Sequence, residues 1–235
     1  MIGLDMADFF EELAKKTWGV LSTGRRFATK KQMKYIFMDI QSKVQFQNRD
    51  MILDIGGGTG QLARFIAPEV ASIHLVDRLP NIVSKTIKMN NLFVYVRDVS
   101  KPFFLGDMMF DKIICYNTIH NIDVDFAIFI KRLLPITKTK GIIFIGDIPL
   151  TEKYEQAKEK YTTFGTLRYV IQKLVTNMFY RLLGIRSRPF FRSFTREEIV
   201  QALVNIPNVE YRFYEQSKKL PFWKSREDLL IKKLL

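Results

Sequence analysis

The sequence contains one cysteine, two histidines and no long apolar run. With Cys115 as the single thiol, an intrachain disulfide framework and a zinc site of several cysteines are both excluded. No apolar stretch reaches the roughly 18 residues that a membrane-spanning helix needs. The first residues also lack the basic stretch and apolar core of a signal peptide. We therefore expect a cytoplasmic protein without a transmembrane segment or a metal site, in which Cys115 is a buried core residue.

Acidic residues are few relative to basic ones. There are 37 lysines and arginines against 24 acids, which gives a formal net charge of +13. This charge favours an anionic partner, but it does not choose among nucleic acid, a phosphorylated metabolite and an anionic membrane surface. The length of 235 residues and the apolar share of 47% fit one large globular domain with room for an insertion.

Apolar runs of strand length recur along the chain, and segments of helix length separate them. Continuous apolar strands joined by helices are typical of a parallel sheet that is covered on both faces. Right-handed crossovers then produce a doubly wound α/β fold. Two later runs with a short polar link predict a terminal antiparallel hairpin, which brings the mostly parallel sheet to seven strands. The predicted strands are 51–55, 72–76, 92–96, 110–116, 141–145, 209–215 and 229–234.

Two regions fall outside this alternation. Residues 1–48 carry apolar residues at helical spacing and then a basic stretch, so we expect a helical cap there, ahead of a main domain at 49–235. Residues 151–192 mix aromatic residues with arginines, and we expect a helical lid insertion over the carboxyl ends of the strands. Thr195 and Glu198 form a capping-box pattern, which predicts the start of the next helix.

The first predicted strand runs into a glycine-rich turn at residues 54–60, with the sequence DIGGGTG. Without Cβ atoms, the backbone of such a turn can approach a ligand closely, and N–H groups at the start of the next helix face it. Residues 58–63 satisfy the G-x-G-x-x-A form of the dinucleotide fingerprint, and Asp77 lies at the next strand end, where a ribose-binding acid belongs. On that interpretation the protein is an NAD enzyme.

Asp54 favours a different ligand. A carboxylate two residues before the glycines would repel the pyrophosphate of NAD, whereas it suits a ligand with a cationic amino group. The pattern of Asp54, Gly56, Gly58 and Gly60 resembles motif I of the class I S-adenosylmethionine-dependent methyltransferases, and the likeness extends over roughly residues 50–150. The resemblance implies a Rossmann-like fold, S-adenosyl-L-methionine as the cofactor and methyl transfer as the activity.

The resemblance also implies further cofactor-binding residues. In that family an acid at the end of the second strand holds the ribose hydroxyls, and Asp77 matches it. An acid after the third strand contacts the adenine amino group, and Asp98 matches it. The segment that begins at Asn117, after the fourth strand, resembles motif IV of the family's small-molecule enzymes.

Two residues are candidates for catalysis. His120 follows the fourth strand, and the pKa of an imidazole suits a general base for an oxygen acceptor. Asp147 ends the fifth strand and could orient an acceptor hydroxyl. A structural role is an open alternative for each: His120 as a packing or helix-capping residue, and Asp147 as a turn residue before Pro149.

The segment after the fourth strand also limits the kinds of methyl acceptor that we expect. It lacks the Asn/Asp-Pro-Pro-aromatic sequence of methylases that act on adenine and glutamine nitrogens, and Cys115 is not preceded by proline as in cytosine-5 enzymes. We therefore expect O-methylation, or N-methylation of an accessible amine, on a small or medium anionic acceptor such as a sugar or a phosphorylated metabolite. The alternatives are an RNA methyltransferase that uses the basic N-terminus and lid, and a non-catalytic binding protein that retains the fold. An aromatic lid is also compatible with a homo-oligomer.

Overall fold

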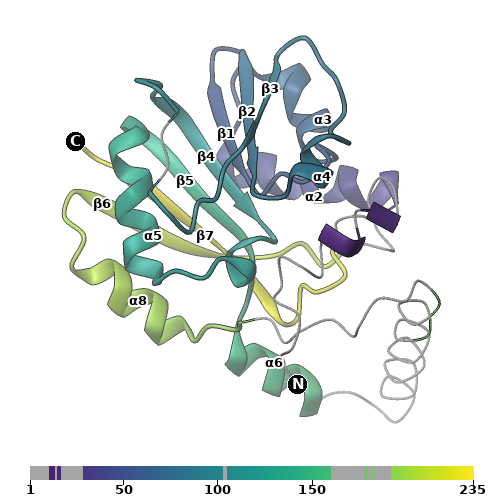
Figure 1. The fold of residues 1–235 in the computed structure, drawn as a ribbon. Coiled ribbons are helices and arrows are strands. Elements are labelled where there is room, and N and C mark those ends of the chain that lie inside the picture. The colour runs from purple at the N-terminus through teal and green to yellow at the C-terminus, as the bar shows by residue number, and fades with distance from the viewer. Residues whose placement is uncertain are drawn as a thin grey trace.

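The computed structural model describes residues 11–13, 15–16, 29–102, 105–159, 178, 182 and 192–235. This part of the chain contains a seven-stranded sheet of order β3-β2-β1-β4-β5-β7-β6 (Figure 1). A strand lies at each of the seven predicted positions, so the predicted seven-stranded α/β sheet is confirmed. The strands are β1 Met51–Ile55, β2 Ser72–Asp77, β3 Leu92–Val96, β4 Phe110–Tyr116, β5 Thr137–Pro149, β6 Val209–Glu215 and β7 Arg226–Lys233.

The sheet is doubly wound around β1. Strands β1 to β5 run parallel, with β2 on one side of β1 and β4 on the other. The chain therefore leaves β1 in opposite directions in its two halves, and ligands of such sheets bind beyond the carboxyl ends of the strands at this switch point. Strand β7 runs antiparallel to both β5 and β6, which confirms the predicted terminal hairpin.

Helices cover both faces of the sheet (Figure 1). Helices α2 and α3 bury apolar side chains against one face, and α5 and α8 bury theirs against the other. Cys115 is fully buried among the residues of the second face, as predicted. The described helices are α2 Lys30–Val44, α3 Ala63–Ile66, α4 Pro80–Val83, α5 Phe126–Leu133, α6 Thr151–Glu159 and α8 Arg196–Val204, with 3-10 turns η2 Ala67–Glu69, η3 Ile119–Asn121 and η4 Leu134–Ile136.

Capping boxes start two of these helices. The Thr195 hydroxyl accepts the N–H of Glu198 while the Glu198 carboxylate accepts the N–H of Thr195, as the sequence predicts for α8. Thr29 and Gln32 form the same reciprocal pair ahead of α2. Helix α2 lies within residues 1–48 and packs on the sheet, and the division of the chain into a cap and a main domain stays a prediction.

The expectation of a helix in every connection is wrong. The connections on either side of β2 hold only the short helices α3 and α4, and residues 97–102 and 105–109, between β3 and β4, contain no helix. Pro102 and Gly106 interrupt the connection between β3 and β4, and both residues oppose helix formation. Because no described helix covers β3 here, the side chain of Phe93 is 47% exposed.

Both ends of the predicted lid insertion are tied to one buried carboxylate. Glu227, on β7, is 2% exposed and pairs with Lys153 at 2.7 Å and with Arg196 at 2.5 Å. Lys153 lies in α6 where the insertion begins, and Arg196 starts α8 just after it ends. The main chains of Leu150 and Phe194 also form an isolated parallel β-bridge. Most of the insertion, 160–191, lies outside the described residues apart from 178 and 182, so the lid itself stays a prediction. No helix in the described ranges is long and apolar enough to cross a membrane.

A buried ionic network joins α2 to the hairpin. The Lys43 ammonium contacts the carboxylates of Asp39 at 2.6 Å and Asp228 at 2.7 Å. The other oxygen of Asp228 accepts the Asp147 N–H at 2.8 Å and the Gln216 amide at 3.0 Å. Burial raises the pKa of Asp228 from its ordinary 3.8 to about 6, although Lys43 and these hydrogen bonds act in the opposite direction.

The raised pKa of Asp228 predicts a pH-dependent stability. Between about pH 4 and 6 the folded protein keeps a proton on Asp228 that the unfolded chain has released, so this contribution to stability falls as pH rises through the window. Asp228→Asn removes the titration. The unfolding free energy of wild type minus that of Asp228→Asn, measured by urea melts, should therefore fall by roughly 2 kcal/mol from pH 4 to pH 7. A difference that stays constant with pH would contradict the assignment.

Candidate active site

The glycine turn begins where β1 ends, at the centre of the sheet. Asp54 lies within β1 and is 2% exposed, and the N–H of Gly56 donates to the carbonyl of Val76 in β2 at 2.8 Å. The glycines allow contacts that a side chain would prevent. A Cβ on Gly57 would lie 2.5 Å from both Asp54 Oδ2 and Leu75 Cγ, and one on Gly56 would lie 2.2 Å from the methyl group of Thr118. The turn is therefore held closely between β2 and the residues after β4.

Asp77, the last residue of β2, contacts the glycine turn. Its carboxylate accepts the N–H of Gly58 at 3.2 Å and the N–H of Leu79 at 3.1 Å. Burial raises the pKa of Asp77, because its effect exceeds that of the two amide hydrogen bonds and of the Arg78 charge. The structure thus brings the predicted ribose-binding acid into direct contact with the glycine turn.

Asp98 lies after β3, one strand further out. Burial alone would raise its pKa, but the hydroxyl and N–H of Ser100 both donate to its carboxylate, at 2.6 and 2.9 Å, and the pKa is lowered overall. The charge of Arg78 also acts on it, as it does on Asp77. Both predicted acids therefore lie at the same edge of the sheet and share one neighbouring cation.

A left-handed residue, Asn117, follows β4, and another, Asp147, lies within β5. The prediction that Asp147 ends the fifth strand is wrong, because β5 continues to Pro149 and Asp147 lies where its pairing with β7 is irregular. Asn117 has a φ of 53° and Asp147 a φ of 60°, a conformation that asparagine and aspartate tolerate better than most residues. The N–H of Asn117 donates to the carbonyl of Gly146, so the two stretches are hydrogen-bonded to each other. A Cβ on Gly146 would lie 2.4 Å from the ring of Tyr116. Asn117 and the irregular stretch of β5 therefore lie side by side at the edge where an acceptor is expected.

The side chain of Asp147 belongs to the buried network rather than to an open surface. It is 6% exposed, with Oδ1 3.3 Å from the amide of Gln216 and Oδ2 3.9 Å from the guanidinium of Arg226. Arg226 also donates to the main-chain carbonyl of Asp147 at 2.9 Å. These contacts favour the alternative in which Asp147 shapes the end of β5.

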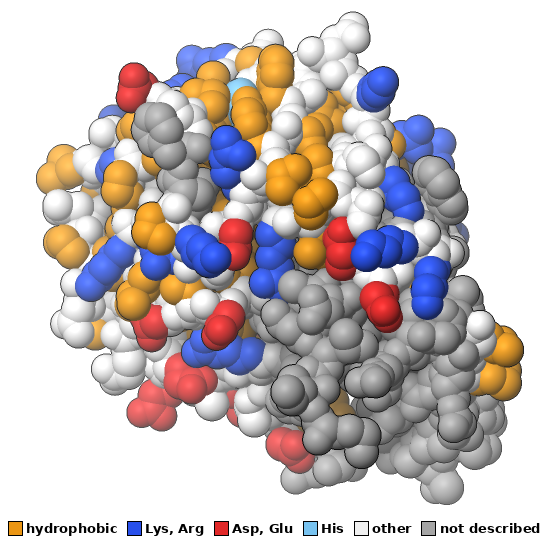
Figure 2. Space-filling model, viewed as in Figure 1, with side chains coloured by type: hydrophobic (Ala, Val, Ile, Leu, Met, Phe, Trp, Pro, Cys, Tyr) orange, Lys and Arg blue, Asp and Glu red, His pale blue; other side chains and the backbone are white. Residues whose placement is uncertain are grey.

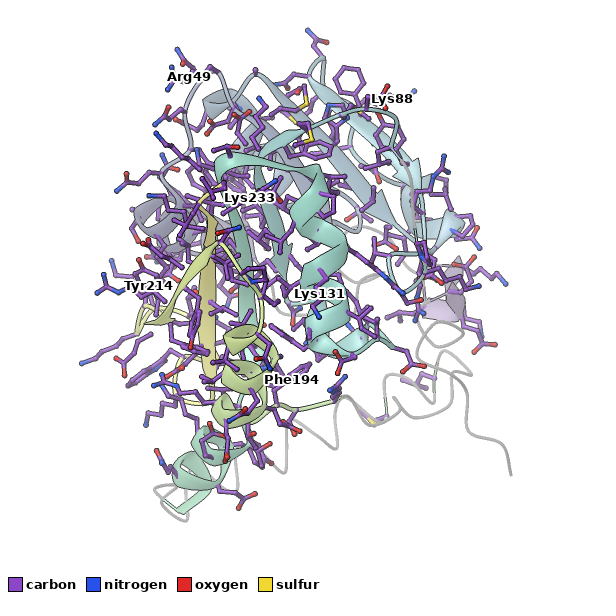
Figure 3. All side chains as sticks on the ribbon, turned by 90° about the vertical axis from the view of Figure 1, so that its left-hand side faces the viewer. Arg49, Lys88, Lys131, Phe194, Tyr214 and Lys233 are labelled. Atoms are coloured by element: carbon purple, nitrogen blue, oxygen red, sulfur yellow. The ribbon has the colours of Figure 1, made fainter. Side chains whose placement is uncertain are left out.

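His120 lies in the turn η3, shortly after the end of β4, and is 4% exposed. The N–H of Arg192 donates to its main-chain carbonyl at 3.4 Å. The Arg192 guanidinium lies 4.6 Å from the centre of the Phe194 ring and donates to the carbonyl of Val124 at 3.1 Å. Figure 3 shows Phe194 far from Arg49, which precedes β1 at the amino end of the sheet. The main chain of the exposed Arg192 therefore lies beside that of His120 at the carboxyl edge, while its guanidinium packs on Phe194.

Some residues that contact the glycine turn or Asp147 belong to no recognisable sequence motif. Thr118 donates to the carbonyls of Tyr116 and Gly56, and Thr86 donates to that of Gly58, yet both are ordinary polar residues in loops. Gln216 reaches Asp147 across 69 positions of sequence. Partners of this kind follow from the packing of distant segments, and no local motif marks them.

The turn fits a cofactor that lies against its backbone. Glycines 57 and 60 leave no space for side chains on its inner side, where Leu75 and Ile87 pack. The hydroxyl of Thr59 is buried and has no hydrogen-bond partner among the described residues, which is uncommon for a buried polar group and leaves a donor for a ligand. Asp54, Asp77, Asp98 and Asn117 surround the turn on neighbouring strand ends.

Comparison with known proteins decides between the candidate cofactors. The model of a methyltransferase domain family matches residues 25–203, which is most of the chain. The chain belongs to this methyltransferase family. It is an enzyme of the class I type with S-adenosyl-L-methionine as its cofactor, so the NAD interpretation is wrong and the alternative of a non-catalytic protein is excluded.

Solved structures show the same fold at low sequence identity. The plantazolicin methyltransferase BpumL in complex with SAH is 14% identical, with a TM-score of 0.60 over 96% of this chain and 95% of that one. An S-adenosylmethionine-dependent methyltransferase from Methanosarcina mazei is 15% identical, with a TM-score of 0.57 over 83% of this chain and 97% of that one. A putative methyltransferase in complex with the Haloferax volcanii Trm112 activator is 12% identical, with a TM-score of 0.63 over 96% and 97%. No curated sequence matches the chain.

The position of Asp77 predicts how cofactor binding responds to acid. If the ionised carboxylate accepts the ribose hydroxyls, Asp77→Asn should weaken binding of S-adenosylhomocysteine roughly tenfold or more at neutral pH, as measured by calorimetry. Because the pKa of Asp77 is raised, the wild-type affinity should fall on acidification at a higher pH than the ordinary 3.8 implies. Asp77→Asn should not show this fall in affinity on acidification.

Asp107→Asn is the control, because Asp107 is an exposed acid in the connection between β3 and β4. It should leave both the affinity and its pH dependence unchanged. Unaltered binding by Asp77→Asn would remove Asp77 from the site.

Proposed function

We propose that this methyltransferase methylates an oxygen of a small or medium anionic acceptor, such as a sugar or a phosphorylated metabolite. The observation that carries the proposal is the neighbourhood of His120 and Arg192 at the carboxyl end of β4, where the N–H of one contacts the carbonyl of the other. A base and an exposed cation carried by neighbouring stretches of main chain suit an acceptor with both a hydroxyl and a negative charge.

We place the cofactor at the glycine turn. Asp54, Gly56, Gly58, Gly60, Asp77, Asp98 and Asn117 are the proposed binding residues. The hydrogen bond between Gly58 and Asp77, and the convergence of the other residues on the same strand ends, support this placement. S-adenosylmethionine, when bound, supplies a methyl group that is already activated on a sulfonium sulfur, so the protein mainly has to position the acceptor in line and remove a proton.

His120 is the proposed base that takes the acceptor's hydroxyl proton as the oxygen–carbon bond forms and the carbon–sulfur bond breaks. Asp147 has a positioning role in this proposal, because its carboxylate is held by Gln216 and Arg226. It fixes the irregular stretch of β5 beside Asn117, and we place the acceptor beyond that stretch.

The described residues on the face drawn in Figure 2 fit a small acceptor better than an RNA strand. Figure 2 shows lysine and arginine side chains interspersed with acidic ones over the described part of this face, rather than gathered in one continuous patch. A surface that tracks a phosphate backbone needs such a patch. Lys30, Lys31 and Lys34 of the basic N-terminal stretch are exposed on α2, whereas most of the insertion lies outside the described residues. The cytoplasmic location and the homo-oligomer stay predictions.

The acceptor class can be tested before the acceptor itself is identified. The purified enzyme is incubated with S-adenosylmethionine carrying a tritiated methyl group and with fractions of a cell extract separated by size and anion exchange. We expect label in a small, anion-exchanger-retained fraction that resists nuclease, with mass spectrometry and NMR locating the methyl group on oxygen. Label in a nuclease-sensitive fraction would establish the RNA alternative, and label on nitrogen would contradict O-methylation.

The role of His120 has an internal control, because the chain has one other histidine. His120→Gln should lower turnover by roughly two to four orders of magnitude, while calorimetry shows an S-adenosylhomocysteine affinity close to wild type. His74→Gln should leave turnover within a fewfold of wild type, since His74 lies in β2 and stacks on Phe93 and Tyr95. Near-normal turnover by His120→Gln would make His120 a structural residue.

A further inference from the structure

The connection from β2 to β3 lies against the glycine turn. After the single helical turn of α4, residues 84–91 are irregular, and two of them contact the turn directly. The Thr86 hydroxyl donates to the carbonyl of Gly58 at 3.1 Å, and the N–H of Ile87 donates to the carbonyl of Thr59 at 3.2 Å. One neighbouring segment thus donates hydrogen bonds to two successive carbonyls of the turn.

Apolar contacts reinforce these hydrogen bonds. A Cβ on Gly60 would lie 3.0 Å from Ile87 Cγ1 and 3.1 Å from Thr86 Cγ2, so both side chains approach the backbone of Gly60 closely. Gly60 has a φ of 76°, which an L-residue rarely adopts. The segment therefore lies against three consecutive residues of the turn, and Thr86 takes part through both its hydroxyl and its methyl group.

Together with Asp77, Thr86 fixes Gly58 on both sides. Asp77 accepts the N–H of Gly58, and Thr86 donates to its carbonyl. In a trans peptide the C=O and N–H point in opposite directions, so fixing the Gly58 carbonyl also fixes the direction of the Thr59 N–H. Without that constraint the peptide between Gly58 and Thr59 is free to rotate, because glycine has many accessible conformations.

We propose that Thr86 is a positioning residue for the cofactor: its hydroxyl holds the Gly58–Thr59 peptide in the orientation that receives S-adenosylmethionine. The proposal rests on the placement of the cofactor at the glycine turn made above. Thr86 acts through the turn and needs no contact with the ligand. Its loss is therefore expected to affect cofactor affinity rather than the methyl-transfer step.

Thr86→Val is the informative variant, because it removes the hydroxyl while keeping the methyl group that contacts Gly60. We expect the Kd for S-adenosylhomocysteine, from calorimetry, and the KM for S-adenosylmethionine to rise roughly three- to tenfold, the range of one lost hydrogen bond. The kcat should stay within about twofold of wild type. Thr86→Ser, which keeps the hydroxyl, should restore both constants.

Thr137→Val is the matched control. The Thr137 hydroxyl is fully buried and donates to the carbonyl of Leu133 at 2.7 Å, at the opposite, amino end of β5. The same substitution there should lower the melting temperature without changing the Kd for S-adenosylhomocysteine. If Thr86→Val does not fold, Thr86→Ala measured against Thr86→Ser gives the same comparison.

The outcomes distinguish the proposed role of Thr86 from the proposed placement of the cofactor at the glycine turn. If Asp77→Asn weakens binding and Thr86→Val does not, the role of Thr86 is overturned while the cofactor site stands. If Asp77→Asn and Thr86→Val both bind S-adenosylhomocysteine like wild type, the placement of the cofactor fails and the role of Thr86 fails with it. A raised Kd for Thr86→Val that Thr86→Ser does not restore would also overturn the proposal, because the hydroxyl would then not be the cause.

Discussion

The close approach of backbone to side chain at Gly57 is the constraint on which this end of the molecule depends. Asp54 and Leu75 occupy the space where a side chain would project, so the chain can leave β1 and turn beside β2 within a few residues. This tight turn places Gly58 within hydrogen-bond distance of Asp77 and of Thr86. A looser turn would separate the ends of β1 and β2, and with them Asp54 and Asp77.

Much of this arrangement could be predicted from local patterns in the sequence. The apolar runs marked every strand, since buried parallel strands are apolar on both faces. Asp54, the glycines and Asp77 were identifiable because they follow a family motif of fixed spacing, and the structure places Asp77 in contact with the glycine turn. The capping box at Thr195 was identifiable for the same reason.

Other features depend on contacts between distant residues, and local patterns do not reveal them. The length of the connection between β3 and β4 predicts a helix, but Pro102 and Gly106 oppose one and its described residues contain none. Asp147 was identified as a strand-end acid, but its partners Gln216, Arg226 and Asp228 come from the hairpin far along the chain. Thr86 was missed because its role depends on how its loop packs against another.

The clamp at Glu227 has a consequence for the evolution of the fold. Lys153 and Arg196 bind the same carboxylate, so a residue near each end of the predicted insertion is fixed at the same point of β7. Closing a longer excursion between two fixed, adjacent ends costs little additional entropy. The number of residues between these two points can therefore change during evolution without moving β5, β7 or the glycine turn.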